Sequence, residues 1–147
     1  MNAVLDAWQA ALAAEHAAIA GYDVLGPRLA DASQVTLARD SQQAHRELRD
    51  ATSARLIAAG QSPVPAAADY PLPFPVTDPA AAQRFAIKLE SACAAAWRYL
   101  ISVADASSRS VRTDAQQALT DSALRAMRWR RLVTPTRATV AFPGIQQ

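Results

Sequence analysis

The sequence contains little glycine, cysteine, lysine or aromatic residue for its length. Its 147 residues include four Gly, one Cys and 6% aromatics, and counting the sequence gives one Lys and 36 Ala. β-branched residues are too sparse and too scattered to build several strands, whereas Ala is the strongest helix former. We therefore expect an all-α protein that forms a single domain over residues 1–147.

Sequence signals for secretion and membrane insertion are also missing. The first residues, Met1 to Asp6, contain neither a basic start nor an apolar run, so we expect no signal peptide. No uncharged stretch reaches the roughly 18 strongly apolar residues that a membrane span needs. The lone Cys93 cannot form an internal disulfide, which fits a reducing compartment. We expect a cytoplasmic protein with no membrane partner.

Motifs of several common chemistries are absent as well. The sequence has no Gly-rich phosphate loop, no CxxC pair and no serine nucleophile elbow. The remaining candidates for a functional site are polar and charged side chains on the predicted helices. Apolar residues that recur every three or four positions predict four helices, at about 3–25, 33–59, 79–104 and 110–131.

A proline-rich segment, 61–77, separates the second predicted helix from the third. Its five prolines exclude regular helix. Fully extended, this segment spans roughly 55 Å, which exceeds the length of about 42 Å of a 28-residue helix. It can therefore return along the full length of a helix pair. The links between the first and second helices and between the third and fourth are short, so each of these pairs is expected to be antiparallel. A four-helix bundle with one long crossover between helices 2 and 3 has the ferritin-like arrangement.

The last residues, 134–147, contain two prolines and a glycine and predict an extended tail. Val140, Phe142 and Pro143 form an apolar cluster in this tail. Because such a cluster is unfavourable in water, we expect it to pack against the bundle or against a partner subunit.

The few glutamates and histidines are candidate site residues. Glu15, Glu47 and Glu90 fall near the middles of the first three predicted helices. Successive residues of a helix are about 100° apart. Glu15 therefore lies on the apolar stripe of the first helix and Glu90 at the edge of the apolar stripe of the third. Glu47 lies further from the apolar stripe of the second helix. His45 lies on the apolar face of the second helix, and His16 adjoins Glu15.

These residues do not match the ligand pattern of a di-iron bundle. That pattern takes one Glu from each of two helices and a Glu-x-x-His motif from each of the other two. This chain has no Glu-x-x-His, and its fourth helix carries Arg125 near the middle. We therefore expect no metal and no cofactor, but a polar cluster at the centre of the bundle, drawn from Glu15, His16, His45, Glu47, Arg49, Glu90 and Arg125. A bound iron or manganese ion would take Glu15, His45, Glu47 and Glu90 as ligands.

The positive charge of the chain is concentrated near its end. The net charge is +2, but residues 122–147 contain five Arg and no acidic residue. Such residues stabilise the negative end of a helix dipole. The alternative is a docking patch for RNA or an acidic protein, formed by Arg128, Trp129, Arg130 and Arg131.

Short motifs spread over nearly the whole chain form a recognisable set. They are AAEHAA at 13–18, GY at 21–22, AHR at 44–46, RD at 49–50, YPLPFP at 70–75, LE at 89–90, RAMRWR at 125–130 and VAFPG at 140–144. Together they resemble a ferritin-like domain family of unknown function from high-GC bacteria. The resemblance implies a ferritin-like four-helix bundle and no established activity.

We therefore expect a non-catalytic binding or interaction protein, a homodimer, with a degenerate metal site. Two alternatives stay open. One is an iron- or manganese-dependent oxidoreductase that uses an atypical carboxylate and histidine site. The other is a helical module whose basic end docks RNA or an acidic protein.

Overall fold

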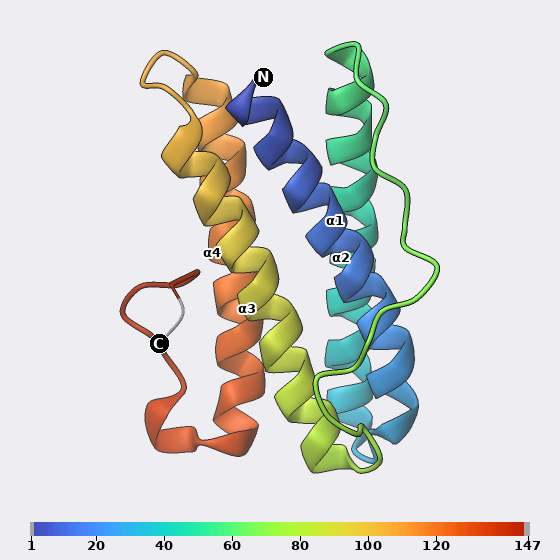
Figure 1. Cartoon of the computed structure of the whole chain (residues 1–147). Coiled ribbons are helices and arrows are strands. Elements are labelled where there is room, and N and C mark those ends of the chain that lie inside the picture. The colour runs from blue at the N-terminus through green and yellow to red at the C-terminus, as the bar shows by residue number, and fades with distance from the viewer. Residues whose placement is uncertain (1, 146–147) are drawn as a thin grey trace.

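The computed structural model describes residues 2–145, which contain helices and no strand (Figure 1). The all-α prediction is therefore confirmed for these residues. The elements are four α-helices with a short 3-10 helix after the first and after the last: α1 Ala3–Leu25, η1 Gly26–Arg28, α2 Ala32–Ala58, α3 Pro79–Val103, α4 Arg109–Val133 and η2 Pro135–Arg137.

Side-chain caps explain where the first three α-helices begin. Asn2 accepts hydrogen bonds from the amides of Val4 and Leu5 at the start of α1. At the start of α2, Asp31 accepts hydrogen bonds from the amides of Ser33 and Gln34. At the start of α3, Asp78 accepts one from the amide of Ala81. Each cap satisfies backbone donors that have no partner inside the helix.

The connections give the topology that the segment lengths predict. In Figure 1, α1 descends, α2 ascends, the proline-rich segment returns along their length, α3 ascends and α4 descends. The returning segment is anchored to the helices. Gln9 of α1 donates to the Ser62 carbonyl at 2.8 Å and accepts from the Val64 amide at 2.8 Å.

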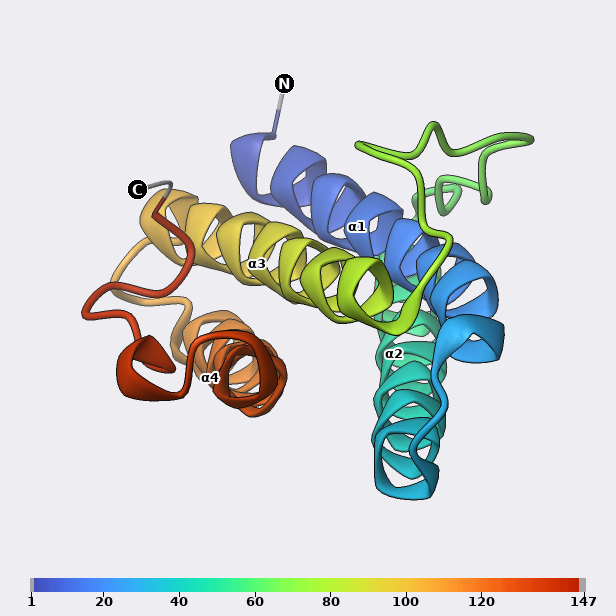
Figure 2. The ribbon, with the colours of Figure 1, turned by 90° about the horizontal axis from the view of Figure 1, so that it is seen from below.

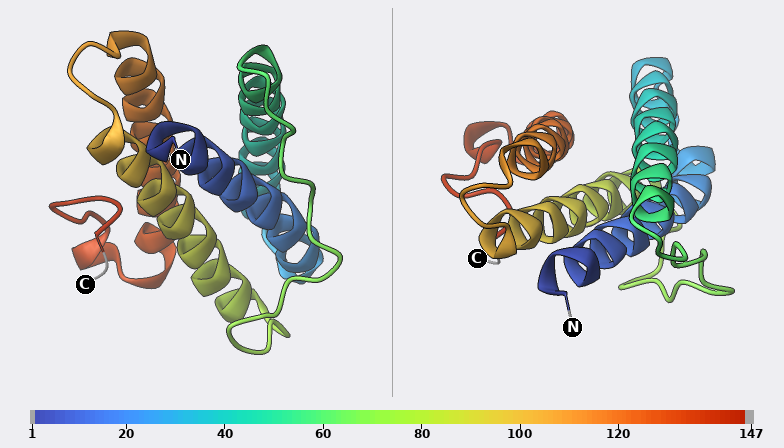
Figure 3. Two further views of the ribbon diagram at one scale, coloured as in Figure 1. Left: turned by 45° about the horizontal axis from the view of Figure 1, so that its top comes forward. Right: turned by 90° about the horizontal axis from the view of Figure 1, so that it is seen from above.

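The helices are not evenly spaced around the core. Figures 2 and 3 show α1 beside α3 and α4 packed on α3, whereas α2 is steeply inclined to α1 and begins far from α4. The core is filled mainly by alanine, leucine and three tryptophans. No helix of the described part is long and apolar enough to cross a membrane.

The C-terminal tail folds back against α3. The Arg98 guanidinium donates to the Pro143 carbonyl at 3.4 Å, and Gly144 adopts φ +83 against the backbone of Ala94. Val140 and Pro143 are half-buried, but Phe142 is 62% exposed. The expectation that Phe142 packs on its own bundle is therefore wrong, because Pro143 and Gly144 take the contact with α3 instead. Packing of Phe142 against a partner subunit stays a prediction.

Gly21 of α1 packs tightly against the Leu89 side chain of α3. A Cβ atom there would clash with both Cδ atoms of Leu89, a residue that is itself only 9% exposed. We expect Gly21→Ala to lower the free energy of unfolding by about 1 kcal/mol, because overpacking costs about 1–3 kcal/mol and exceeds the helix propensity gained.

The matched control is the same substitution in a Leu89→Ala chain, where the clashing methyl groups are gone. There Gly21→Ala should be neutral or stabilising, as measured by urea unfolding of all four chains of the double-mutant cycle. Equal effects in both backgrounds would contradict the assigned contact.

Candidate functional site

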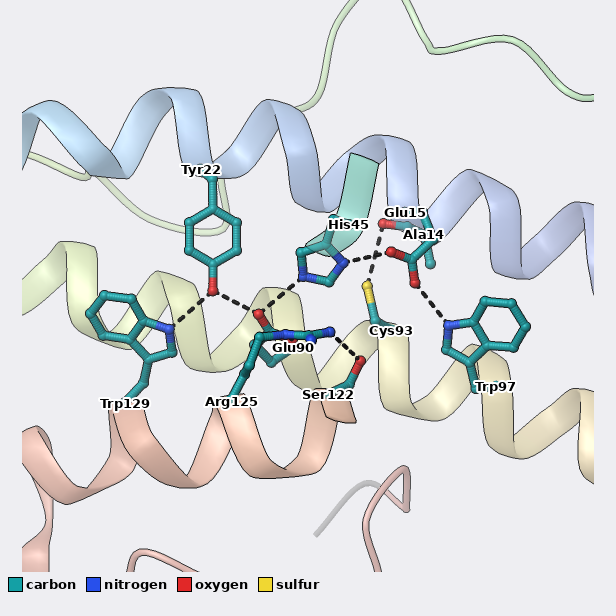
Figure 4. Close-up of polar contacts among 10 residues, drawn as sticks. All are labelled: Ala14, Glu15, Tyr22, His45, Glu90, Cys93, Trp97, Ser122, Arg125 and Trp129. Atoms are coloured by element: carbon teal, nitrogen blue, oxygen red, sulfur yellow. Dashed lines mark hydrogen bonds and ion pairs between the residues drawn. The ribbon is translucent and has the colours of Figure 1, made fainter. Parts of the chain in front are cut away.

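A continuous set of hydrogen bonds joins the four helices at their middles (Figure 4). Glu15 and Tyr22 of α1 are seven residues apart, as are Glu90 and Trp97 of α3, so each pair lies on one face of its helix. We call this set the polar core network, and its members are Glu15, Tyr22, His45, Glu90, Trp97, Ser122, Arg125 and Trp129.

His45 is the centre of the polar core network. Its Nδ1 lies 2.5 Å from Oε2 of Glu15, and its Nε2 lies 3.0 Å from Oε1 of Glu90. All three side chains have no exposed surface. Because a carboxylate accepts hydrogen bonds, an imidazole that contacts one carboxylate with each nitrogen is best satisfied when both nitrogens carry a proton.

The other carboxylate oxygens are also paired. The Trp97 indole donates to Oε1 of Glu15 at 2.8 Å, and Nε of Arg125 donates to Oε2 of Glu90 at 3.0 Å. The Tyr22 hydroxyl donates to Oε1 of Glu90 at 2.7 Å.

A second tier of contacts holds these donors in place. The Trp129 indole donates to the Tyr22 hydroxyl at 3.0 Å, and Arg125 donates to the Ser122 hydroxyl at 3.2 Å. Every ionisable member of the polar core network therefore has a partner, as buried polar groups require.

The pKa shifts follow from burial and from these contacts. Burial disfavours the imidazolium form of His45, but the hydrogen bonds and charges of Glu15 and Glu90 outweigh it and raise the His45 pKa from 6.5 to about 9. Burial alone would raise the pKa of Glu90, yet His45, Arg125 and Tyr22 together lower it. Burial and the neighbouring Glu90 raise the Tyr22 pKa well above its ordinary value, so the phenol keeps its proton.

At neutral pH the cluster is therefore close to electrically neutral. The carboxylates of Glu15 and Glu90 are balanced by the cations of His45 and Arg125. Removing one partner of a buried ion pair leaves an uncompensated charge and costs about 3–5 kcal/mol. The arrangement thus depends on all four charges together.

Cys93 lies next to this network in α3. Its thiol donates to the Ala14 carbonyl at 3.5 Å, and burial together with the charges of Glu15 and Glu90 raises its pKa well above the ordinary value. One donor atom each from Glu15, His45 and Cys93 lie within 4.8 Å of one another. These are acceptable ligand types for a single transition-metal ion.

A di-iron cluster, which the ferritin-like resemblance suggests, does not fit the donor set. Two iron ions need about four carboxylates and two histidines, whereas the network contributes the carboxylates of Glu15 and Glu90 and the imidazole of His45. The Arg125 guanidinium, which is always charged, already contacts Glu90. The donor set therefore does not suit di-iron chemistry.

Comparison with known proteins identifies the family of this bundle. A family model described as a domain of unknown function, DUF4439, matches residues 7–147. The chain belongs to this family. A crystal structure of a conserved hypothetical protein, rv2844, from Mycobacterium tuberculosis is similar, with a TM-score of 0.82 and 38% identity over 88% of this chain and 96% of that one. No curated protein matches.

The DUF4439 fold brings together some of the predicted centre residues and separates others. Glu15, His45, Glu90 and Arg125 meet at the centre. Three predicted members do not. His16 contacts the Val64 carbonyl of the crossover, Glu47 is exposed and accepts from Gln43, and Arg49 pairs with Asp50 at the surface. Glu47, which we expected as a ligand only in case a metal ion binds, is at the surface and does not belong to the central cluster.

Four members of the network were not predicted as part of the central polar cluster. Tyr22, Trp97 and Trp129 lie on the apolar stripes of their helices, so a role in core packing was expected for them. Ser122 also lies on such a stripe, and its small side chain gave no reason to expect a polar role. The sequence spacing could have indicated two of these members. Tyr22 follows Glu15, and Trp97 follows Glu90, by two helical turns, which places each pair on one face of its helix.

The predicted docking patch at the basic end also needs correction. Trp129 is fully buried and its indole is bonded to Tyr22, so it cannot stack on a base. Arg130 is half-buried and donates to Ser91 at 3.1 Å. Arg128 and Arg131 remain exposed.

The raised His45 pKa predicts a pH-dependent stability for this DUF4439 domain. A folded-state pKa above the unfolded value gives a stabilisation that is complete below about pH 6.5 and is lost as the pH rises through about 9. We expect the free energy of unfolding to fall by about 2 kcal/mol between about pH 6.5 and 8.5.

The matched control is His16→Gln, which removes the other histidine and should leave this pH dependence intact. Chemical unfolding at a series of pH values provides the measurement. A stability that is flat across this window, or a slope that disappears in His16→Gln, would show that His45 is not the titrating group.

Proposed function

We propose that this chain is a ferritin-like bundle that works as a non-catalytic binding or interaction protein, with an ion cluster in place of a metal centre. The observation that carries the proposal is the position of His45, whose two ring nitrogens contact Glu15 and Glu90 at 2.5 and 3.0 Å. The cation that a pair of buried carboxylates requires is thus provided by the protein.

The charges around the centre support the same proposal. Arg125 contributes a second fixed cation, and the guanidinium would repel a metal ion placed near Glu90. The three side chains at the centre have no exposed surface. A substrate therefore has no path to a reactive group without opening the helices, which favours binding at the outside of the bundle.

Iron uptake tests this proposal directly. The purified chain is incubated anaerobically with excess ferrous iron, desalted, analysed for bound metal and then exposed to air. We expect well under one iron per chain and no oxo-bridged absorption, because His45 and Arg125 already neutralise the carboxylates. About two irons per chain, the stoichiometry of a di-iron bundle, would overturn the proposal.

A metal-dependent oxidoreductase is the second candidate. The observation that favours it is the proximity of Glu15, His45 and Cys93. Parallel incubations with manganese and zinc address a single-metal site. Binding of one metal per chain that is lost in Cys93→Ser and kept in His16→Gln would support this candidate instead. The homodimer and the cytoplasmic location remain predictions.

A further inference from the structure

A groove lies between α3, α4 and the returning C-terminal tail, away from the polar core network. It consists of two neighbouring cavities of about 520 and 820 Å³. Ala123, Arg130, Val140 and Pro143 line both cavities, so the two cavities adjoin one another. Each is within the range of about 300–1,000 Å³ that small-molecule sites occupy.

The walls of this tail groove are mostly apolar. The first cavity is lined by side chains such as Ile101, Leu119, Leu124 and Met127, and the second by Ile87 and several alanines. Phe142 and Leu124 lie at the groove while 62% and 45% exposed. Large apolar side chains that are exposed to solvent and line the same cavity are typical of a binding surface.

Cations line the tail groove without any acidic residue. Arg98 and Arg130 line the first cavity, Lys88 and Arg130 line the second, and no Asp or Glu lines either. Within residues 2–145 none of these three cations makes an ion pair with a carboxylate.

Arg130 is the cation that lines both cavities and is held by a side-chain hydrogen bond. Its guanidinium donates to the Ser91 hydroxyl at 3.1 Å, and burial lowers its pKa. A half-buried guanidinium that lacks an anion gains most from a ligand that brings one. The groove therefore combines a long apolar wall with a fixed positive charge where its two cavities meet.

We propose that the tail groove binds a long-chain fatty acid, with its hydrocarbon chain between α3, α4 and the tail and its carboxylate at Arg130. Arg98 lies in the same cavity and is a second donor to the carboxylate. A nucleic acid would instead need cations spaced along an open polar surface, whereas these cations are set among apolar walls.

This inference deepens the proposed binding function by naming a ligand class, and it does not involve the polar core network. Failure of the two proposals can therefore be distinguished. Uptake of two irons per chain would contradict the proposed non-catalytic centre but not the proposed fatty-acid site. Absence of fatty-acid binding would contradict the proposed fatty-acid site but not the proposed non-catalytic centre.

The test is a titration of the delipidated full chain with oleate below its micellar concentration, followed by calorimetry. We expect saturable binding of one oleate per chain. Oleyl alcohol keeps the hydrocarbon chain without the charge, and butyrate keeps the charge without the long chain. Each should bind at least about tenfold more weakly than oleate if charge and apolar contact both contribute.

Two arginines of the same helix provide the matched variants. Arg130→Gln should weaken oleate binding about tenfold, as the loss of a charge-assisted hydrogen bond predicts, while Arg128→Gln should not change it, because Arg128 is exposed and does not line the groove. Arg130→Lys retains the charge and should bind oleate better than Arg130→Gln. Thermal unfolding of each variant shows whether the fold is intact.

Several results would overturn the proposal. They are equal binding of oleate and oleyl alcohol, unchanged binding in a folded Arg130→Gln, or no saturable binding by the unmodified chain. Binding only to anionic phospholipid vesicles would assign the groove to a membrane surface instead. Displacement of oleate by a short RNA, with a steep salt dependence, would assign its cations to nucleic acid.

Discussion

The imidazolium of His45, held between two carboxylates that have no exposed surface, is the interaction on which the rest of the structure depends. Through it α2 is joined to Glu15 of α1 and Glu90 of α3, and Arg125 extends the same contacts to α4. Because α2 is inclined and begins far from α4 (Figure 2), the contacts of His45 near its middle are important for holding it to the other helices. A buried carboxylate without a partner would cost several kcal/mol, so the proton on His45 is part of the fold.

The same contacts give the two buried carboxylates a source of positive charge other than a metal ion. In carboxylate-bridged centres the metal ions supply the positive charge. In this chain His45 and Arg125 supply it, and the indole donors of Trp97 and Trp129 and the Tyr22 hydroxyl complete the hydrogen bonding. Cys93, whose raised pKa keeps it a thiol, does not add a third negative charge. With the centre closed in this way, the binding site that we propose lies at the surface, in the tail groove.

The sequence predicted the helices well because their apolar periodicity, proline-rich connection and caps are local features. It also placed Glu15 and His45 inside, since both lie on apolar stripes. It could not distinguish Arg125 from Arg49 as the partner of Glu90. Arg49 lies one turn beyond His45, but its long side chain reaches the surface and pairs with Asp50. The tail was the least predictable part, because Pro143 and Gly144 dock by backbone contacts that have no periodic signal and leave Phe142 exposed.

The protonation state of His45 is the most direct test of this account. Nitrogen NMR of the histidine side chains, recorded as a function of pH and assigned with His16→Gln, reports whether one or both ring nitrogens carry a proton. The account predicts that both His45 nitrogens stay protonated at pH 7.5 and that His45 titrates with a pKa of about 9. A His45 ring that is neutral at pH 7.5 would contradict the central claim.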